Sequence, residues 1–490
     1  MKKTKLVIVA LALAFVMAIP TMVVADDRCV PPSADPVIIK PVRAIFEEIG
    51  GVVTWQGEDR SIHIDIEGGT IVLFVDQTAA YVNDNAITLE DAVILWNDRS
   101  FITEDDLMLL LETFMDTIPQ GEVNLIIIGE AVAERSEILN ITSADGYVLQ
   151  GRLTIPEGDE EISGLVIFIN GSGPQNFLTS FYLSGLGVGN WFDIWANGFL
   201  DEGIAFFSSS TRGVSPNTEP PAFLEIDVAG YATYRPSNSV EDIYHIIRYL
   251  QDNPRLADSK VFLLGYSEGG FVASLFKEAY PGMADVLLLA APMLINGYEL
   301  LYLQLTGQAN MMVLSTLFEA DEYLRISEEA FYAGPWETIF GAAFADVDLN
   351  GDGFICGEDI TIMLGQEGLA DEVFNAIHQR NDEWLHENVP SIPLSGWFHE
   401  YMALRPRLEV LPGLELPVYV FQGTMDVVTP ITKVFELQEA VAEGGNTNFT
   451  FIFFEDYGHD MNIITMPVAF HGETPAVVRA ILDAVMTRVQ

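Results

Sequence analysis

The stretch Val261-Phe-Leu-Leu-Gly-Tyr-Ser-Glu-Gly-Gly270 decides the fold of this chain. Its apolar first half predicts a buried strand, and residues 271–280 predict a helix directly after the turn. Such an abrupt turn leaves no room for a Cβ two residues before or after Ser267, and the sequence has glycine at both places. The turn holds the serine hydroxyl above the sheet and sets the backbone N–H of Glu268 at a helix N-terminus. We interpret Ser267 as a nucleophile; the alternative is a serine that only caps the helix.

Strands and helices alternate on both sides of this turn. Such alternation predicts an α/β fold with a mostly parallel, doubly wound sheet. Residues 294–410 lack strand signals and carry Leu, Phe, Trp and Met at helical spacing, so we expect a helical insertion, here called the lid, over the C-terminal edge of the sheet. The predicted strands are 138–142, 147–155, 164–169, 204–208, 261–264, 286–290, one from 417, and 448–454, with helices at 191–200, 239–252 and from 475 to the end.

A serine nucleophile needs a base, which should lie in a loop after a strand that follows the turn. His459, in Asp456-Tyr-Gly-His-Asp-Met461, directly follows the predicted strand 448–454 and fits this position. His471 is the rival, further from its strand end. His245 falls in a predicted helix before the turn, where packing is the simpler interpretation. The seven histidines of the chain are His63, His245, His378, His386, His399, His459 and His471.

The acid that orients the base should end the preceding strand. Asp426 lies at the end of the segment that begins at residue 417 and fits this role. Asp456 and Asp460 are alternatives by proximity, but a sequence neighbour seldom meets the imidazole Nδ1 correctly. The resulting order of Ser267, Asp426 and His459 places the acid before the histidine.

The oxyanion that forms during acyl transfer needs two N–H donors. The first is the backbone N–H of Glu268, and we assign the second to the backbone N–H of Ser172 in Asn170-Gly-Ser-Gly-Pro174, the loop after the strand 164–169. The flanking glycines let this backbone approach a substrate closely. The alternative is an ordinary glycine turn. The Arg212-Gly213 pair is expected to brace the neighbouring loop.

Residues 137–490, apart from the lid, resemble the α/β-hydrolase superfamily, and especially exported bacterial esterases with His-Gly-Ser-Gly-Pro, Arg-Gly and Gly-x-Ser-x-Gly-Gly motifs. The resemblance carries the nucleophile, acid and base onto Ser267, Asp426 and His459. Asn170 stands where the family has histidine, a residue that shapes the loop. The resemblance implies acyl ester hydrolysis, and it also admits peptidases and thioesterases because fold and triad do not fix the substrate.

A calcium-loop motif lies within the lid, in Asp348-Leu-Asn-Gly-Asp-Gly-Phe-Ile-Cys-Gly-Glu-Asp359. Gly353 takes the sixth position, where the loop must bend, and Ile355 takes the eighth, the apolar anchor. The loop resembles the EF-hand in its dockerin version, which implies one structural Ca²⁺ that clips the lid helices. Dockerins carry two such repeats, and the sequence shows one. The implied ligands are the side chains of Asp348, Asn350, Asp352 and Asp359 and the backbone carbonyl of Phe354.

The N-terminal part has a different organisation. Residues 1–25 predict a secretory signal with an apolar stretch from Leu6 to Ile19. Residues 36–115 predict a small α+β module, with a helix that carries Ile45 and Ile49 and strands at 61–66 and 70–75, and residues 116–136 predict a linker. The Pro-Val-Arg…Phe-Glu…Gly…Trp pattern of residues 36–115 resembles the copper amine oxidase N-terminal-like module. One histidine, His63, falls within it, so we expect no redox chemistry there.

The composition limits the partners. The formal net charge is −48, from 23 basic and 71 acidic residues. This balance argues against nucleic acid and anionic membrane as partners and predicts a solvated acidic surface. Cys29 and Cys356 are too few for a disulfide framework, and nothing in the sequence favours their pairing. The mature protein is expected to be exported without a membrane span, either free or associated with the cell surface through its N-terminal module.

The sequence therefore predicts a secreted serine hydrolase of the carboxylesterase type that acts on a small-molecule ester and needs no cofactor for catalysis. The alternative from another class is a non-catalytic, calcium-stabilised module of the cell envelope. Apolar lid residues favour a hydrophobic acyl or alcohol group, or else form only the lid's own core. They are Met293, Leu300, Leu301, Met311, Met312, Phe318, Phe331 and Trp336.

Overall fold

The computed structural model describes residues 39–489 apart from 43–45, 47–51, 58, 67–68, 84, 97–98, 104–105, 108, 111–112, 115–123, 159, 184–186, 218–222, 318, 334–342 and 465–472. The predicted signal, the helix with Ile45 and Ile49, Phe318, Trp336 and His471 lie outside these described residues.

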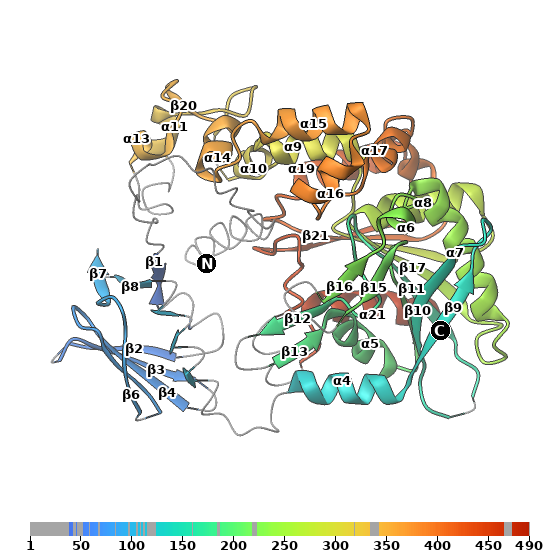
Figure 1. Ribbon diagram of the computed structural model, residues 1–490, viewed down its shortest axis with the longest axis horizontal. Coiled ribbons are helices and arrows are strands. Elements are labelled where there is room, and N and C mark those ends of the chain that lie inside the picture. The colour runs from blue at the N-terminus through green and yellow to red at the C-terminus, as the bar shows by residue number, and fades with distance from the viewer. Residues whose placement is uncertain are drawn as a thin grey trace.

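An eight-stranded sheet forms the centre of the larger part of the chain (Figure 1). Its order is β22-β21-β18-β17-β11-β14-β10-β9; β10 pairs antiparallel with β9 and with β14, and all other neighbours pair in parallel. This is the predicted mostly parallel, doubly wound sheet, in the α/β-hydrolase topology. The strands are β9 (Ser136–Thr142), β10 (Val148–Thr154), β11 (Gly164–Ile169), β14 (Ala205–Ser209), β17 (Lys260–Tyr266), β18 (Val286–Ala290), β21 (Val418–Gly423) and β22 (Phe449–Phe454).

Successive side chains of the central strands alternate between two hydrophobic cores. In β17, Phe262 and Leu264 join the core on one face, and Val261 and Leu263 join the core on the other. All four are buried, which explains why the strand reads as an unbroken apolar run. Helices α5 (Trp191–Leu200) and α21 (Ala476–Val489) cover the first face, and α7 (Pro236–Gln251), α8 (Glu268–Ala279) and α19 (Ile431–Glu443) cover the second.

The lid is inserted between β18 and β21 and lies across the top of the view in Figure 1. It is helical as predicted, except that two short strands, β19 (Ile326–Ser327) and β20 (Phe354–Ile355), pair antiparallel within it. Two-residue strands leave no readable period in a sequence. The described helices are α9 (Gly297–Leu305), α10 (Gln308–Leu314), α11 (Glu328–Ala333), α13 (Phe344–Val347), α14 (Gly357–Met363), α15 (Leu369–Gln379), α16 (Asp382–Asn388), α17 (Ser395–Tyr401) and α18 (Arg407–Val410).

The N-terminal module contains a five-stranded antiparallel sheet in sequential order, β2 to β6. The predicted strands at 61–66 and 70–75 are present as β3 (Ser61–Ile66) and β4 (Gly69–Phe74). Alternate side chains such as Ile62 and Ile64 are buried, as the pattern of the sequence indicates. The other strands are β1 (Ile39–Pro41), β2 (Val52–Gln56), β5 (Ala79–Val82), β6 (Asn85–Thr88), β7 (Ile94–Trp96) and β8 (Arg99–Thr103).

Part of the segment predicted as a linker is helical. Helix α4 (Asn124–Glu134) lies against α5, where a Cβ on Gly129 would come within 3.3 Å of a carboxylate oxygen of Asp193. The contact ties the helix that precedes β9 to α5, the first helix that covers the sheet.

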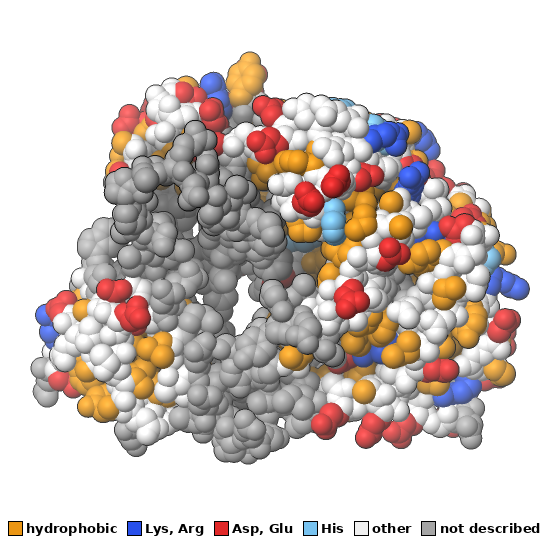
Figure 2. Space-filling view, viewed as in Figure 1, with side chains coloured by type: hydrophobic (Ala, Val, Ile, Leu, Met, Phe, Trp, Pro, Cys, Tyr) orange, Lys and Arg blue, Asp and Glu red, His pale blue; other side chains and the backbone are white. Residues whose placement is uncertain are grey.

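The surface carries the charge that the composition predicts. Figure 2 shows acidic side chains scattered over the described parts of the face in view, among fewer basic ones. None of the helices in the described part of the chain is long and apolar enough to span a bilayer.

Candidate active site

Ser267 occupies a strained turn between β17 and α8. Its φ is 56° and its ψ is −119°, a conformation that side-chain-bearing residues rarely adopt. Two backbone hydrogen bonds hold the turn in place: the N–H of Ser267 donates to the carbonyl of Ala290 at 2.9 Å, and its carbonyl accepts from the N–H of Met293 at 2.8 Å. The neighbouring strand and the start of the lid thus fix a serine at the C-terminal edge of the sheet, as the sequence predicts.

The glycines on either side of Ser267 are sterically required. A Cβ on Gly265 would lie 2.4 Å from the carbonyl oxygen of Gly269, and a Cβ on Gly269 would lie 2.0 Å from the carbonyl oxygen of Ile169. Both obstacles are backbone atoms, and they cannot move aside without shifting the start of α8 or the central strand β11.

Replacing Gly269 by alanine should therefore destabilise the fold by at least about 3 kcal/mol, because overpacking against backbone cannot be relieved locally. Gly282→Ala is the matched control, since its Cβ would meet nothing within 4 Å, and it should change stability by about 0.5 kcal/mol or less. Urea unfolding of the two variants measures the difference. Equal stabilities would show that the turn has room that the structure does not indicate.

His459 and Asp426 are hydrogen-bonded to each other. Nδ1 of His459 lies 2.9 Å from Oδ2 of Asp426, at the ends of β22 and β21 respectively. Asp426 has no exposed surface, while His459 is partly exposed. The buried carboxylate is positioned to keep the proton of the imidazole on Nδ1 and to leave Nε2 free as a base.

Asp426 is itself held by four other donors. Its Oδ1 accepts the N–H groups of Val428 and Thr429, both at 2.8 Å, and its Oδ2 accepts the hydroxyl of Thr429 at 2.7 Å and the amide of Gln422 at 2.9 Å. Sequence reasoning did not find Gln422 and Thr429, which have no motif of their own. These bonds satisfy a carboxylate that has no contact with water.

The imidazole lies beside the residue that precedes the nucleophile. The rings of His459 and Tyr266 are 5.3 Å apart between centroids, and the Tyr266 hydroxyl donates to the carbonyl of His459. In the described part of the chain no hydrogen bond reaches the Ser267 hydroxyl or Nε2 of His459. Such bonds are often long in unliganded enzymes and tighten when substrate binds.

Two of the rival groups, Asp460 and His245, make contacts of their own. Nδ1 of His459 is bonded to Asp426 and contacts Thr429. Asp460 accepts the N–H of Asn462, and burial raises its pKa. His245 lies in α7 with its ring against Tyr244, the packing role expected from the sequence.

The loop after β11 lies next to the nucleophile. A Cβ on Gly171 would come within 3.1 Å of Cβ of Ser267, a tight contact that glycine avoids. Gly173 has a φ of 98° and turns the chain away, with Ser172 exposed between the two glycines. The loop thus brings the predicted second oxyanion donor into the neighbourhood of Ser267.

Asn170 is anchored away from the base. Its Nδ2 donates to the carbonyl of Ser209 at 2.7 Å, while its Oδ1 is buried without a partner among the described residues. The side chain thus links the ends of β11 and β14 and shapes the loop, in the place where the resembled family has histidine.

Glu268 has a role that its position in the motif does not reveal. Its side chain is 1% exposed and accepts hydrogen bonds from three donors: the Tyr234 hydroxyl, Nε1 of Trp397 at 2.7 Å and the Tyr401 hydroxyl at 2.7 Å. Trp397 and Tyr401 belong to the lid helix α17, so the residue next to the nucleophile anchors the lid. The sequence offers one signal of this role: a carboxylate residue directly follows the nucleophile, at a position that the fold buries.

Burial raises the pKa of Glu268 to about 7, against the opposing effect of its three donors. A carboxyl with a raised pKa binds a proton more tightly in the folded state than in the unfolded state. This contribution to stability is complete below the ordinary carboxyl range and is lost as the pH rises through about 7.

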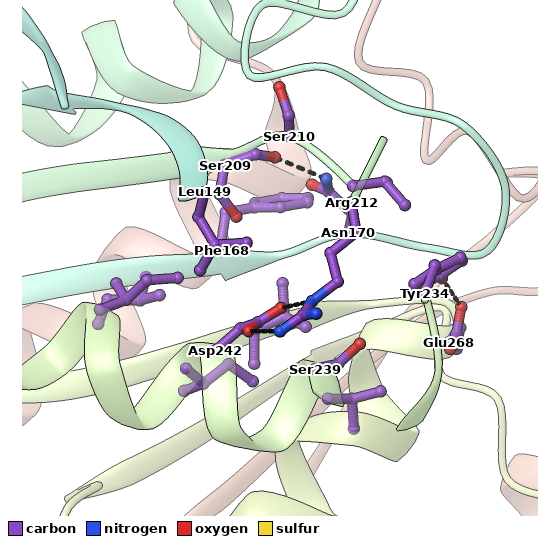
Figure 3. A pocket seen from close by; sticks show the side chains of 16 residues that line it. Leu149, Phe168, Asn170, Ser209, Ser210, Arg212, Tyr234, Ser239, Asp242 and Glu268 are labelled. Atoms are coloured by element: carbon purple, nitrogen blue, oxygen red, sulfur yellow. Dashed lines mark hydrogen bonds and ion pairs between the residues drawn. The ribbon is translucent and has the colours of Figure 1, made fainter. Parts of the chain in front are cut away.

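A small pocket of about 60 Å³ lies behind Glu268 and Asn170 (Figure 3). It can hold water but is far smaller than a substrate pocket. Arg212, on its wall, binds Asp242 at 2.6 Å and pairs with Asp145. Arg212 therefore braces the loop after β14 against α7 and the β9–β10 turn, as the sequence predicts.

The predicted calcium loop lies between α13 and α14. Gly353 has a φ of 86°, which permits the required bend. The carboxylates of Asp348 and Asp352 accept backbone N–H groups of the loop, and the fully buried Asp359 accepts those of Leu349 and Cys356. Among the described residues no three His, Cys, Asp or Glu side chains are gathered as a metal centre requires. The donor set has the oxygen chemistry that Ca²⁺ prefers, but its carboxylates are bonded to the backbone.

A second segment, residues 319–330, pairs with this loop through β19 and β20, with Ile326 opposite Ile355. Leu324 has a φ of 60° two residues before Ile326, as Gly353 does before Ile355. In this segment the Arg325 guanidinium binds Asp321 at 2.8 Å and lies 4.1 Å over the ring of Phe354. Sequence reasoning missed this partner, because it lacks the acidic and glycine positions of the motif.

The described apolar residues of the lid lie mostly in its own cores. Met293, Leu300, Leu301, Met311 and Phe331 are each less than a tenth exposed and pack in two lid clusters. This arrangement favours the structural interpretation of these residues over contact with a substrate.

Comparisons with known proteins find similarities for both parts of the chain. Residues 26–107 match the model of the copper amine oxidase N-terminal domain. A search of curated proteins finds no match. Similar solved structures include an esterase from Exiguobacterium antarcticum (15% identity, 72% of this chain and 98% of that one, TM-score 0.36) and a thermophilic esterase from Thermogutta terrifontis (15%, 72% and 99%, 0.38). A putative dipeptidyl aminopeptidase IV from Bacteroides ovatus is also similar (11%, 89% and 43%, 0.40).

Proposed function

We propose that this chain, which combines an α/β-hydrolase fold with a copper amine oxidase N-terminal domain, is a serine hydrolase that cleaves acyl esters. One observation carries the proposal: the strained Ser267 turn and the bonded pair of His459 and Asp426 lie at the same edge of one sheet. Nucleophile, base and orienting acid are the parts that acyl transfer requires.

In the proposed reaction, Nε2 of His459 takes the hydroxyl proton of Ser267 while Oγ bonds to the acyl carbon. The N–H groups of Glu268 and Ser172 donate to the oxyanion. His459 then gives its proton to the departing alcohol oxygen as the ester C–O bond breaks. Water attacks the acyl-enzyme, with its proton passing to His459, and collapse of the second tetrahedral intermediate returns the proton to Ser267 and releases the acid. Asp426 holds the imidazole throughout.

The choice of substrate is tested by turnover of p-nitrophenyl esters of increasing acyl length. We expect hydrolysis, with a length profile that describes the acyl site. A serine peptidase or thioesterase of the same fold would instead cleave peptide p-nitroanilides or acyl thioesters faster than esters. A non-catalytic envelope module would turn over none of them.

We further propose that residues 348–359 bind one Ca²⁺ that clips the lid helices. Asp348, Asn350, Asp352 and Asp359, with the carbonyl of Phe354, would hold the ion. The paired segment 319–330 supports this assignment. There the Arg325 guanidinium binds the Asp321 carboxylate and supplies a positive charge. In residues 348–359 a bound cation would supply the corresponding positive charge. The ion is proposed to stabilise structure and to take no part in the chemistry.

Calcium should therefore raise the melting temperature and leave kcat nearly unchanged. At a free concentration about 100 times the dissociation constant, binding adds about 2.7 kcal/mol of stability, and chelator should remove it. Asp352→Asn should abolish the shift, whereas Asp258→Asn, an exposed carboxylate elsewhere, should keep it. Thermal melts with and without Ca²⁺ measure this shift in melting temperature. The assignment would be contradicted if the two variants shifted equally, or if neither the wild type nor Asp258→Asn shifted.

We propose that the mature protein acts outside the cytoplasm. The predicted signal and the copper amine oxidase N-terminal domain support export, the latter because such modules occur on many exported bacterial proteins. The strongly acidic composition supports a small uncharged or weakly charged ester as partner, in preference to a nucleic acid. Contact with the cell envelope would fall to the N-terminal module.

A further inference from the structure

The hydroxyl of Tyr234 lies between two acceptors. It is within hydrogen-bond distance of Oε2 of Glu268 and also, at 3.5 Å, of the carbonyl oxygen of Gly171. A phenol has one hydroxyl hydrogen, so it donates to only one of these acceptors at a time. Figure 3 shows Tyr234 and Glu268 facing each other at one end of the pocket.

The carbonyl of Gly171 belongs to the same peptide group as the N–H of Ser172. In a planar trans peptide these two groups point in opposite directions, so a hydrogen bond to the carbonyl fixes where the N–H points. This peptide group lies beside the nucleophile, as the approach of Gly171 to Cβ of Ser267 shows. The hydroxyl of Tyr234 therefore acts on the backbone unit that carries the proposed oxyanion donor.

We propose that Tyr234 and Glu268 are positioning residues for the oxyanion site, with Tyr234 fixing the Gly171–Ser172 peptide group and Glu268 deciding whether the Tyr234 proton is available for it. This inference rests on the proposed function, since it assigns a role within the same acyl-transfer site. Neither side chain touches the reacting atoms.

The protonation state of Glu268 sets the direction of the relay. Oε1 already accepts from Trp397 and Tyr401, so a proton on the carboxyl lies on Oε2, facing Tyr234. The protonated carboxyl donates to Tyr234, which then donates to Gly171. The ionised carboxylate instead accepts from Tyr234, and the Gly171 carbonyl loses its donor.

Both states are populated near neutral pH, because burial raises the pKa of Glu268 to about 7. The fully buried tyrosines around it have pKa values raised well above their ordinary range, again by burial, and do not titrate there. The titratable groups facing Glu268 are Tyr231 and Tyr234 before α7 and Tyr401 on α17. Arg212 and Asp242 line the same pocket, and Glu400 acts on Tyr401.

Three full-length variants test the relay. Tyr234→Phe removes the hydroxyl and keeps the ring. Glu268→Gln mimics the protonated carboxyl, because its amide donates to Tyr234 and its carbonyl still accepts from the lid. Tyr231→Phe is the matched control, because it removes the hydroxyl of another buried tyrosine, whose ring stacks on that of Tyr234 with centroids 5.8 Å apart. Among the described residues this hydroxyl makes one hydrogen bond, a long one to the carbonyl of Ile392.

The readouts are kcat and KM for a p-nitrophenyl ester from pH 6 to 9, and inhibition by a trifluoromethyl ketone, which binds as an oxyanion. Tyr234→Phe should lower kcat by about 10- to 100-fold and weaken the ketone equally, with KM within about twofold. Glu268→Gln should keep its kcat at pH 9, where the wild type declines, and Tyr231→Phe should follow the wild type.

Several results would overturn the relay alone. The first is a Tyr234→Phe enzyme with the kcat and ketone affinity of the wild type. The second is a loss of kcat in Tyr231→Phe as large as that in Tyr234→Phe. The third is a Glu268→Gln enzyme whose kcat declines toward pH 9 as that of the wild type does. A folded wild-type protein with no ester turnover and no labelling of Ser267 by a fluorophosphonate would overturn the proposed function, and the relay with it. Labelling without turnover keeps the relay testable, because the labelling rate then replaces kcat.

Discussion

Replacing Ser267 by alanine is expected to lower kcat for ester hydrolysis by about 10⁵-fold or more, because no acyl-enzyme can form. The substitution removes one oxygen at a site that is 6% exposed and leaves the backbone turn in place. Steady-state turnover of the purified variant measures the effect. The melting temperature should change little, since the Ser267 hydroxyl has no hydrogen bond among the described residues.

Ser274→Ala is the matched control for this variant. Ser274 is a buried serine of the same helix, α8, whose hydroxyl donates to the carbonyl of Phe271. It should retain activity within a few-fold. If Ser267→Ala hydrolysed esters at a rate within tenfold of the wild type, another group would have to be the nucleophile.

Replacing Asp426 by asparagine is expected to lower kcat by about 10⁴-fold. The amide cannot accept on both of its termini, so the hydrogen bond that keeps the proton on Nδ1 of His459 is lost or reversed, and Nε2 is no longer free as a base. Because Asp426 accepts from Gln422 and Thr429 as well, the variant should also lose stability. The comparison of kcat with the melting temperature separates the two effects.

Asp460→Asn is the control that distinguishes the acid from its neighbour in sequence. Asp460 flanks His459 in the sequence, but its carboxylate accepts the N–H of Asn462. The Asp460→Asn enzyme should keep most of its activity. The reverse pattern, with Asp460→Asn inactive and Asp426→Asn active, would assign the orienting acid to Asp460.

The central sheet could be predicted from the sequence because most of its strands are short apolar runs with clear ends. β18, for example, begins and ends where the run 286–290 does. The pairing of β19 with β20 could not be predicted, since two residues show no alternation and their partner segment lacks the motif. Helix α4 lies in the stretch 116–136, which the sequence predicts only as a linker.

The triad residues could be proposed from chain order, since each lies at a strand end that the topology brings to one edge. The surroundings of Glu268 could not. Its donor Tyr234 lies 34 residues before it in the chain, and its donors Trp397 and Tyr401 lie 129 and 133 residues after it. These segments meet only when the lid is folded. A tyrosine in a loop and a tryptophan in a lid helix have many more common roles, so no local pattern singles them out.

The most direct test of the proposed function is to treat the folded protein with a fluorophosphonate and map the adduct by mass spectrometry. The reagent reacts with an activated serine, whose Oγ displaces fluoride from phosphorus. We expect one adduct per chain, on the peptide that contains Ser267, and none in Ser267→Ala. An adduct on another residue, or no adduct on a protein that melts cooperatively, would contradict the assignment of Ser267 as an activated nucleophile.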